Sequence, residues 1–330
     1  MHPRTVGPYA LLSVLGMGRF GRLHLARTEK GTRVAVRVIR HELAADRWFR
    51  ACLREQVDVV SRIRGPRVAA VLDADVDADA PWLATEYVPA PSIAALLSRC
   101  GPLSVDGVRR LGVELAEAIE AIHRAGAVHR DLRPGNILVT ASGPRVVDAG
   151  IARAAAASPL TRGGGLIGAP GYLAPEQLLN GPGEPASDVF ALGSVLLHTA
   201  TWRAPFGTGD VVAVLHRMLR VGPDLRGLDP GVVPIVAACL HPDPTRRPTP
   251  REVRDALAEP AANPPAPATG DDDPPVAESS PDDARPEPVP ADKFPAQRTA
   301  ADRASEEAGP EDAAPRDAAS RVAVGDHGPY

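Results

Sequence analysis

The segment HRDLRPGN at positions 129–136 constrains this chain more than any other stretch. Two short apolar runs joined by a turn follow it over 137–147, and the next residue is Asp148, which opens the tripeptide DAG. Because such a pattern predicts a small hairpin, Asp131 and Asn136 before it and Asp148 after it can face one site. An aspartate beside a substrate hydroxyl, with an asparagine and a second aspartate able to hold a divalent cation, is the minimum chemistry for moving a phosphoryl group.

The start of the chain predicts a strand, a glycine turn and a second strand. An apolar run at 9–15 leads into GMGRFG, in which Gly16, Gly18 and Gly21 are spaced as G-x-G-x-x-G, and a second run follows at 23–26. A dinucleotide-binding fingerprint would require a helix after the third glycine, and none is predicted there. Glycines at a hairpin tip let backbone N–H groups approach phosphates, so a phosphate-covering loop is one interpretation and an ordinary hairpin turn is the other.

Short strands and then helices are predicted over the next part of the chain. The run 34–39 is β-branched and alternating, and the helix predicted over 46–64 has an apolar residue at every third or fourth position. The remaining expected elements are strands at 68–72 and 82–88 and helices at 92–99, 104–125 and 250–258. Three later motifs are GAPGYLAPE at 168–176, DVFALG at 188–193 and DPTRRPT at 243–249.

These motifs, in this order, resemble those of the bacterial, eukaryotic-like Ser/Thr protein kinases. The resemblance covers about residues 9–258, and its most specific parts are HRDLRPGN and GAPGYLAPE. It implies an α+β, two-lobed protein-kinase-like fold for a domain over 1–258. The β-rich N-lobe would comprise about residues 9–88 and the helical C-lobe about residues 89–258.

The resemblance also implies an ATP site that uses Mg²⁺ or Mn²⁺. Asp131 would be the catalytic aspartate, Arg133 the cation of its loop, and Asn136 and Asp148 the metal ligands. The backbone of the glycine turn at Gly16, Gly18 and Gly21 would cover the phosphates, which Arg37 would contact.

The nucleotide base would lie between the two lobes. By resemblance, Ala35 and Leu138 supply apolar surfaces on either side of the adenine, and the backbone of Glu86 and Val88 bonds to its edge. Glu55, on the helix predicted over 46–64, would form an ion pair with Arg37. The alternative for Glu55 is a solvent-exposed position, because glutamate in a helix is usually exposed.

Several residues around this site have expected supporting roles. His129 is expected to be a packed histidine that holds the loop, and Arg130 is a cation of the kind that pairs with a phosphorylated loop. Ser158 and Thr161 are the available acceptors for autophosphorylation, although either can equally be an unmodified loop residue. By resemblance, Arg247 forms a structural ion pair with Glu176 of the APE motif.

Four residues of the expected catalytic site differ from those that are usual in the family. Arg37 and Arg133 stand where lysines are usual, Ala149 where phenylalanine is usual, and Ala169 where threonine is usual. Only Lys30 and Lys293 are lysines, which indicates a general replacement of Lys by Arg, but an arginine fork is longer and cannot act as a compact point charge. Loss of the aromatic ring at Ala149 should loosen the active arrangement.

The sequence is therefore compatible with two classes of function. The first is an active or weakly active kinase that transfers the ATP γ-phosphoryl group to protein Ser or Thr hydroxyls. The second is a pseudokinase that acts as a nucleotide-binding or scaffolding module. A small-molecule kinase is disfavoured, because the APE segment belongs to the protein-kinase branch.

Composition separates the end of the chain from the rest. From Glu259 onward there are 16 acidic and 6 basic residues among many Pro, Ala, Gly and Ser, without apolar periodicity. This composition predicts a disordered tail over 259–330, with electrostatic docking onto the basic body as the alternative.

The cysteines and the apolar runs indicate the environment of the protein. Cys52, Cys100 and Cys239 are widely spaced in apolar contexts and are expected to be reduced core residues. The longest apolar run, at 232–240, is too short to span a bilayer. The expected location is the cytoplasm, with a protein substrate, no nucleic-acid partner and no membrane span.

Overall fold

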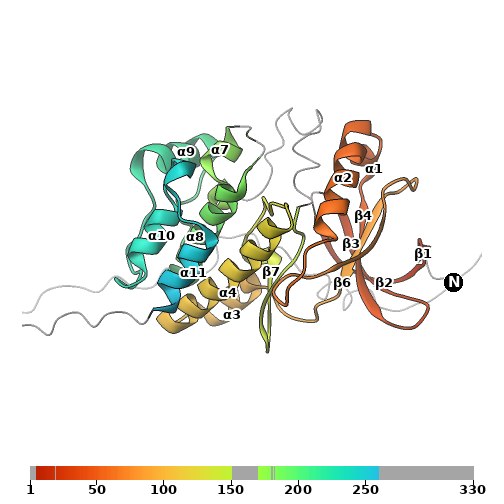
Figure 1. Cartoon of the computed structure of the whole chain (residues 1–330), viewed down its shortest axis with the longest axis horizontal. Helices are drawn as coiled ribbons and strands as arrows, with labels where there is room; N and C mark the ends of the chain where they lie inside the picture. Colours follow the sequence, from red (N-terminus) through yellow and green to blue (C-terminus); the bar gives the residue numbers. More distant parts are fainter. Residues whose placement is uncertain (1–4, 19, 151–169, 180, 182, 260–330) are drawn as a thin grey trace, which may run out of the picture. The chain divides into compact units, whose positions relative to one another are not determined.

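A curved antiparallel sheet forms the N-terminal lobe. The computed structural model describes residues 5–18, 20–150, 170–179, 181 and 183–259. The sheet has six strands in the order β1-β2-β3-β4-β6-β5 (Figure 1). In chain order they are β1 (Thr5–Val6), β2 (Tyr9–Gly18), β3 (Gly21–Arg27), β4 (Arg33–Ile39), β5 (Val71–Asp75) and β6 (Trp82–Glu86).

Two helices cover one face of this sheet. Helix α1 (His41–Ala44) is short, and α2 (Arg47–Val60) begins where the side chain of Asp46 accepts the N–H of Trp48 at 2.8 Å. Phe49 and Leu53 of α2 are buried against the sheet. Helix α2 ends at Val60, earlier than the predicted end near Arg64, because the chain turns before Gly65 and Pro66.

The described part of the C-terminal lobe is helical apart from one hairpin, which consists of β7 (Ile137–Thr140) and β8 (Gly143–Val146). Its α-helices are α3 (Ile93–Cys100), α4 (Val105–Arg124), α7 (Pro175–Leu178), α8 (Pro185–Thr201), α9 (Val211–His216), α10 (Val233–Cys239) and α11 (Pro250–Ala258). Short helical turns are η1 (Pro134–Asn136), η2 (Pro170–Tyr172), η3 (Arg217–Val221) and η4 (Pro244–Arg246).

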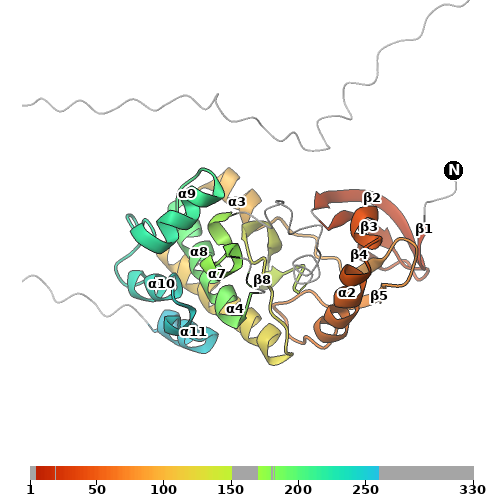
Figure 2. The ribbon, with the colours of Figure 1, turned by 90° about the horizontal axis from the view of Figure 1, so that it is seen from above.

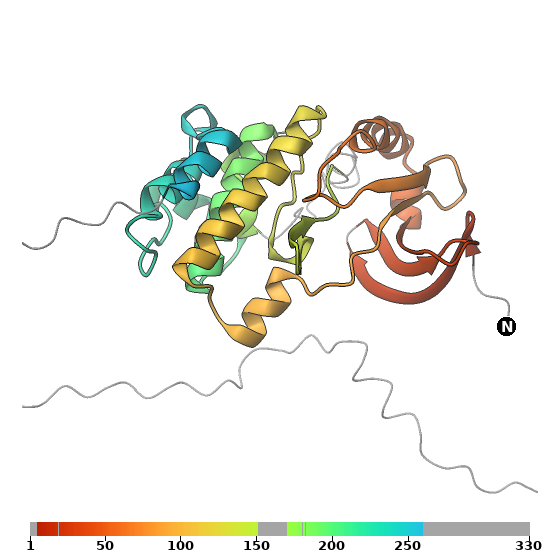
Figure 3. The ribbon, with the colours of Figure 1, turned by 60° about the horizontal axis from the view of Figure 1, so that its bottom comes forward.

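Helix α8 lies at the centre of the C-terminal lobe. Its residues from Ser187 to Leu197 are all buried, and it packs against α4 and α10. Figure 3 shows the long helix α4 beside α8 and α11, and Figure 2 shows the same group from another side. A helix that is apolar all round must be covered on every side. Helix α8 is therefore a fixed base for the loops that leave it.

Backbone pairing joins the two lobes. The N–H of Ala69 donates to the carbonyl of Val146 at 2.9 Å, and the N–H of Val146 donates to the carbonyl of Arg67 at 2.7 Å. The strand predicted over 68–72 is therefore wrong at its start, because residues 67–69 pair with β8 and β5 begins only at Val71. Arg67 adds an ion pair to Glu114 of α4 at 2.7 Å. These contacts fix the hairpin β7–β8 against the sheet.

The cysteines differ in their surroundings. All three are free thiols, and Cys239 is buried, whereas Cys52 is half-buried and Cys100 is exposed. The expectation of a core position is wrong for Cys100, because it is the last residue of α3. In the described part of the chain, none of the helices combines the length and the apolar character needed to cross a membrane.

Candidate active site

The loop 129–136 is held from below by the carboxylate of Asp188 on α8. Asp188 is fully buried, and its two oxygens accept the backbone N–H groups of His129 and Arg130, each at 2.8 Å. The Nε2 atom of His123 lies 2.8 Å from Oδ2 of the same carboxylate. Burial alone would raise the pKa of Asp188, but hydrogen bonding and charge from His123, together with the N–H of Arg130, lower it.

His129 joins the loop to the strand side of the hairpin. Its ring is fully buried; Nδ1 accepts the N–H of Asp131 at 3.2 Å, and Nε2 lies 3.1 Å from the carbonyl of Val147. Because Nδ1 is an acceptor here, the ring proton of the neutral imidazole is on Nε2 and is donated to Val147. The prediction of a packed, loop-holding histidine is confirmed.

Asp131 is oriented by two neighbours in its own loop. The amide Nδ2 of Asn136 donates to the carbonyl of Asp131 at 2.8 Å and to its Oδ2 at 3.1 Å. The Nε of Arg133 lies 3.4 Å from the same Oδ2. The Oδ2 atom of Asp131 is therefore fixed by the amide of Asn136 and the cation of Arg133. This sets the direction of the other carboxylate oxygen, Oδ1.

Arg37 of β4 reaches across to Asp148. The Nη2 atom of Arg37 lies 2.6 Å from Oδ2 of Asp148, and the arginine is buried. Asp148 has a φ of 63°, a region that residues other than glycine rarely adopt. The metal-ligand candidate and the phosphate-contact candidate are thus joined to each other in this structure.

The expected ion pair between Arg37 and Glu55 is not formed. Glu55 is exposed, and within the described ranges its carboxylate makes no ion pair with Arg37. Helical phase is the reason, because the buried face of α2 runs through Phe49, Leu53, Gln56 and Val60. The residue that faces inward is Gln56, which sequence analysis missed although the spacing from Phe49 would have indicated it.

A cavity of about 430 Å³ lies between the sheet and the hairpin β7–β8. This volume is in the range of small-molecule sites. The predicted site residues among its lining are Gly16, Gly18, Ala35, Arg37, Glu86, Val88, Arg133, Asn136, Leu138 and Asp148. Asp131 is not in the lining but is bonded to Asn136, which is. The apolar lining residues that sequence analysis missed are Leu15, Met17, Leu23, Ala90 and Val147.

Gly21 and Glu86 serve the site indirectly. A Cβ built on Gly21 would lie 1.8 Å from the carbonyl oxygen of Val38, so only glycine permits this approach of β3 to β4. The carboxylate of Glu86 is bonded to Arg145 of β8. The backbone N–H of Glu86 is also used, since it donates to the carbonyl of Ala70 at 2.9 Å.

Ala149 leaves little empty space beside it. The cavity that it lines with Val60, Ile63, Val68 and Leu83 measures about 10 Å³. That is about the volume required by one water molecule. The expected loosening at Ala149 therefore does not take the form of a large void among the described residues.

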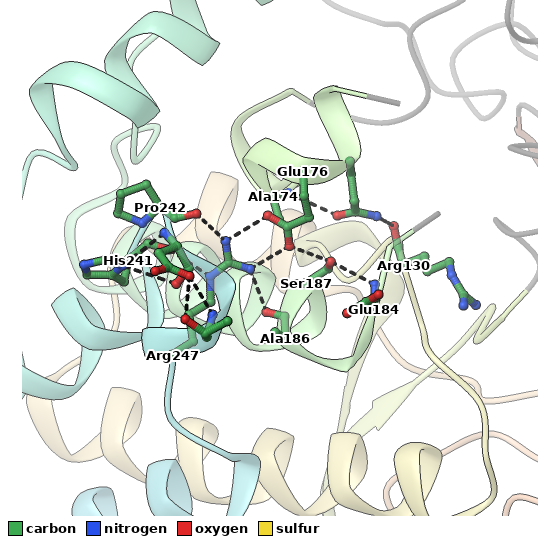
Figure 4. Close-up of polar contacts among 12 residues, drawn as sticks. Arg130, Ala174, Glu176, Glu184, Ala186, Ser187, His241, Pro242 and Arg247 are labelled. Carbon is green, nitrogen blue, oxygen red and sulfur yellow. Dashed lines mark hydrogen bonds and ion pairs between the residues drawn. The ribbon is translucent and has the colours of Figure 1, made fainter. Parts of the chain in front are cut away.

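The APE segment is fixed by a bidentate ion pair between Glu176 and Arg247 (Figure 4). Nη1 and Nη2 of Arg247 lie 2.7 and 2.9 Å from the two carboxylate oxygens of Glu176, as predicted. The hydroxyl of Ser187 donates to the same carboxylate at 2.7 Å. Gln177 extends this network to the loop 129–136 by donating to the carbonyl of Arg130 at 3.1 Å.

Arg130 uses its guanidinium within the lobe. Its Nε donates to the carbonyl of Gly183 at 3.0 Å, and its Nη1 donates to that of Val128 at 3.1 Å. The candidate phosphorylation sites Ser158 and Thr161, the departure Ala169 and the tail 260–330 lie outside the described residues.

Residues 9–258 match the family model described as the protein kinase domain. The chain belongs to the protein kinase domain family. The two-lobed α+β fold predicted for this kinase domain is confirmed, since the solved kinase domain of Mycobacterium tuberculosis PknI aligns with a TM-score of 0.62 at 24% identity. The alignment covers 78% of this chain and 97% of that structure.

Bacterial serine/threonine kinases are among the relatives of this kinase domain. It is 43% identical over 257 residues to the serine/threonine-protein kinase AfsK of Streptomyces coelicolor, across 78% of this chain and 32% of the relative. It is 41% identical over 273 residues to the probable serine/threonine-protein kinase PkwA of Thermomonospora curvata, across 83% of this chain and 36% of the relative. The chain thus spans about a third of the length of these relatives.

Proposed function

We propose that this kinase domain transfers the γ-phosphoryl group of ATP to Ser or Thr hydroxyls of proteins. The observation that carries the proposal is the arrangement of Asn136 and Asp148 in the lining of one cavity, with Asp131 hydrogen-bonded to Asn136. Phosphoryl transfer depends mainly on positioning and charge stabilisation, and these three side chains supply both.

The residues present fit a divalent cation that binds together with a nucleotide. Asn136 uses Nδ2 to donate to Asp131, which leaves its Oδ1 as an acceptor, and Asp148 lines the same cavity. No group of three or more His, Cys, Asp or Glu side chains suited to a metal occurs among the described residues. Mg²⁺ is usually held by one or two carboxylates together with substrate phosphates, so this small ligand set suits a Mg²⁺·ATP complex. When bound, the cation would neutralise charge on the phosphates.

Asp131 has the geometry of a group that accepts the proton of a substrate hydroxyl. Its Oδ2 is held by Asn136 and Arg133, and this fixes the remaining carboxylate oxygen. The side chain of Arg133 is partly exposed, so its cation can also face the transferred group. Arg37, beneath the glycine turn, supplies a second positive charge for the phosphates.

The second candidate, a pseudokinase, is not favoured. Asp131, Asn136 and Asp148 are retained and fixed by hydrogen bonds or an ion pair, and the named relatives are serine/threonine kinases. A general replacement of lysine by arginine in this chain explains why arginine stands at positions 37 and 133, and this replacement preserves the positive charge.

Transfer of label from radiolabelled ATP tests the proposal. The chain is incubated with Mg²⁺ or Mn²⁺, alone and with a protein substrate, and the labelled product is hydrolysed for phosphoamino-acid analysis. Label on phosphoserine or phosphothreonine is the expected result. Nucleotide binding without any label under both metals would contradict the proposal and support the pseudokinase alternative.

A further inference from the structure

Arg40, which follows the last residue of β4, holds the glycine turn from outside the cavity between the sheet and the hairpin β7–β8. Its Nη2 donates to the carbonyl oxygen of Gly18 at 3.1 Å. A Cβ built on Gly18 would lie 3.0 Å from Nη1 of Arg37, which lines that cavity. Gly18 is therefore contacted by one arginine from within the cavity and by a second arginine that is not part of the lining.

The backbone of Arg40 is fixed on both sides of its Cα. Its N–H donates to the carbonyl of Phe20 at 3.0 Å, and its carbonyl accepts the N–H of Ala44 at 3.0 Å. A Cβ built on Gly21 would lie 3.0 Å from the backbone nitrogen of Arg40 and 1.8 Å from the carbonyl oxygen of Val38. Because only glycine permits this approach, the third glycine of the motif brings Arg40 within reach of the turn.

The guanidinium of Arg40 has no carboxylate partner among the described residues. A second cavity, of about 330 Å³, borders the turn, and Arg40 lines it together with Arg22 and Glu42. Glu42 forms no ion pair with either arginine within the described ranges. Met17 lines both cavities, so the turn is the wall between them. The carbonyl of Gly18 is therefore the acceptor that orients the Arg40 cation.

A bond to this carbonyl fixes the direction of a whole peptide group. The six atoms of a trans peptide lie in one plane, in which the carbonyl and the N–H point in opposite directions. When Arg40 holds the Gly18 carbonyl, the N–H of the same peptide group is turned away from Arg40. Backbone N–H groups that converge at a turn bind anions such as phosphates.

We propose that Arg40 is a positioning residue for the phosphates of the nucleotide, which it does not contact itself. Arg40 keeps the Gly18 carbonyl on the outer side of the turn, so that the side facing the cavity presents N–H groups to the phosphates. A carbonyl oxygen on the cavity side would repel them. This inference rests on the proposed function, since it takes ATP as the ligand of the cavity.

Equilibrium dialysis of the full chain with labelled ATP, and separately with labelled adenosine, tests the inference. Arg40→Met removes the donor, and we expect ATP binding to weaken by about threefold to tenfold, the effect of one hydrogen bond. Adenosine has no phosphates, so its affinity should change by less than about twofold. Arg40→Lys keeps a donor and should retain most of the ATP affinity.

Arg22→Met is the matched control for the loss of charge. Arg22 is exposed and lines the same second cavity, and its guanidinium makes no hydrogen bond or ion pair among the described residues. The control removes the same positive charge near the turn without removing a bond to it. Its ATP affinity should therefore stay close to that of the wild type.

Three results would overturn the inference. The first is an Arg40→Met protein that binds ATP as tightly as the wild type or the Arg22→Met control. The second is an equal loss of ATP and adenosine affinity, which would show general damage to the cavity. The third is an Arg40→Lys protein as weak as Arg40→Met. None of these measurements requires phosphate transfer, whereas failure of the proposed function would be a wild type that binds ATP without transferring label.

Discussion

Asp188 holds the backbone of Arg130 in a conformation that arginine rarely adopts. Its Oδ1 accepts the Arg130 N–H at 2.8 Å, and Arg130 has a φ of 67°. Backbone strain of this kind costs about 1–3 kcal/mol and persists only where surrounding contacts fix it. The loop that carries Asp131 is therefore shaped by a carboxylate on the central helix of the lobe.

Asp188→Asn should strongly destabilise the domain. An amide nitrogen cannot accept, so one of the two backbone N–H groups of the loop would lose its buried partner. We expect the free energy of unfolding to fall by about 2–4 kcal/mol, measured by urea denaturation. Asp58→Asn, on the exposed side of α2, is the matched control and should change little. Equal stability of both variants would show that Asp188 does not restrain the loop.

The ion pair of Glu176 should make stability depend on pH. Burial alone would raise the pKa of Glu176, but hydrogen bonds from Arg247 and Ser187 hold it below its ordinary value of 4.5. A group with a lowered folded-state pKa stabilises the fold above its unfolded pKa, and this stabilisation is lost as the pH falls through the folded value. The contribution of Glu176 is therefore complete at neutral pH and disappears in acid.

Glu176→Gln should remove this contribution. We expect the variant to lose about 2 kcal/mol of unfolding free energy near pH 7 and less near pH 3, which lies below the ordinary pKa, because the carboxyl of the unfolded wild type is protonated there. Urea titrations at both pH values measure the difference. Glu29→Gln, at an exposed position, serves as control. A deficit that is the same at both pH values would mean that Glu176 acts through packing rather than charge.

Restoring an aromatic ring at Ala149 should not improve packing. Since the adjacent cavity measures only about 10 Å³, Ala149→Phe should overpack the core and lower the free energy of unfolding by about 1–3 kcal/mol. Ala51→Phe, on the exposed face of α2, should be nearly neutral. A more stable Ala149→Phe protein would show that the phenylalanine site is still open.

The contiguous motifs of this protein could be predicted from sequence, and the contacts between distant segments only in part. The loop around Asp131 and the packed His129 followed from one local motif, and the pair of Glu176 with Arg247 followed from the resemblance to the family. Arg37 and Asp148 lie far apart in sequence, and no local pattern indicates that they form an ion pair.

Two errors came from helix and strand phase. The pairing of Glu55 was expected from its place in the series of family motifs, whereas the buried face of α2 passes through Gln56, one position and about 100° further round the helix. The strand expected at 68–72 begins later because residues 67–69 pair with β8, and this pairing is set by how the lobes meet. Such pairing depends on tertiary contacts that override local preference.

Nucleotide together with metal should stabilise the folded chain. A ligand that binds only the folded state at a hundred times its Kd adds about 2.7 kcal/mol of stability. We expect ATP with Mg²⁺ to raise the melting temperature, and either component alone to do so much less. Asp148→Asn should remove the metal-dependent part of the shift. An equal shift with ATP alone would show that Asp148 and Asn136 hold no cation.

The rate of phosphate incorporation in wild type and Asp131→Asn tests the central claim most directly. The measurement is the initial rate with saturating radiolabelled ATP and Mg²⁺, with nucleotide affinity checked separately for both proteins. The account predicts label on Ser or Thr in the wild type and a loss of at least about a thousandfold in Asp131→Asn, equivalent to about 4 kcal/mol of transition-state stabilisation, with unchanged nucleotide affinity. Equal incorporation by the two proteins, or none by the wild type despite bound nucleotide, would contradict it.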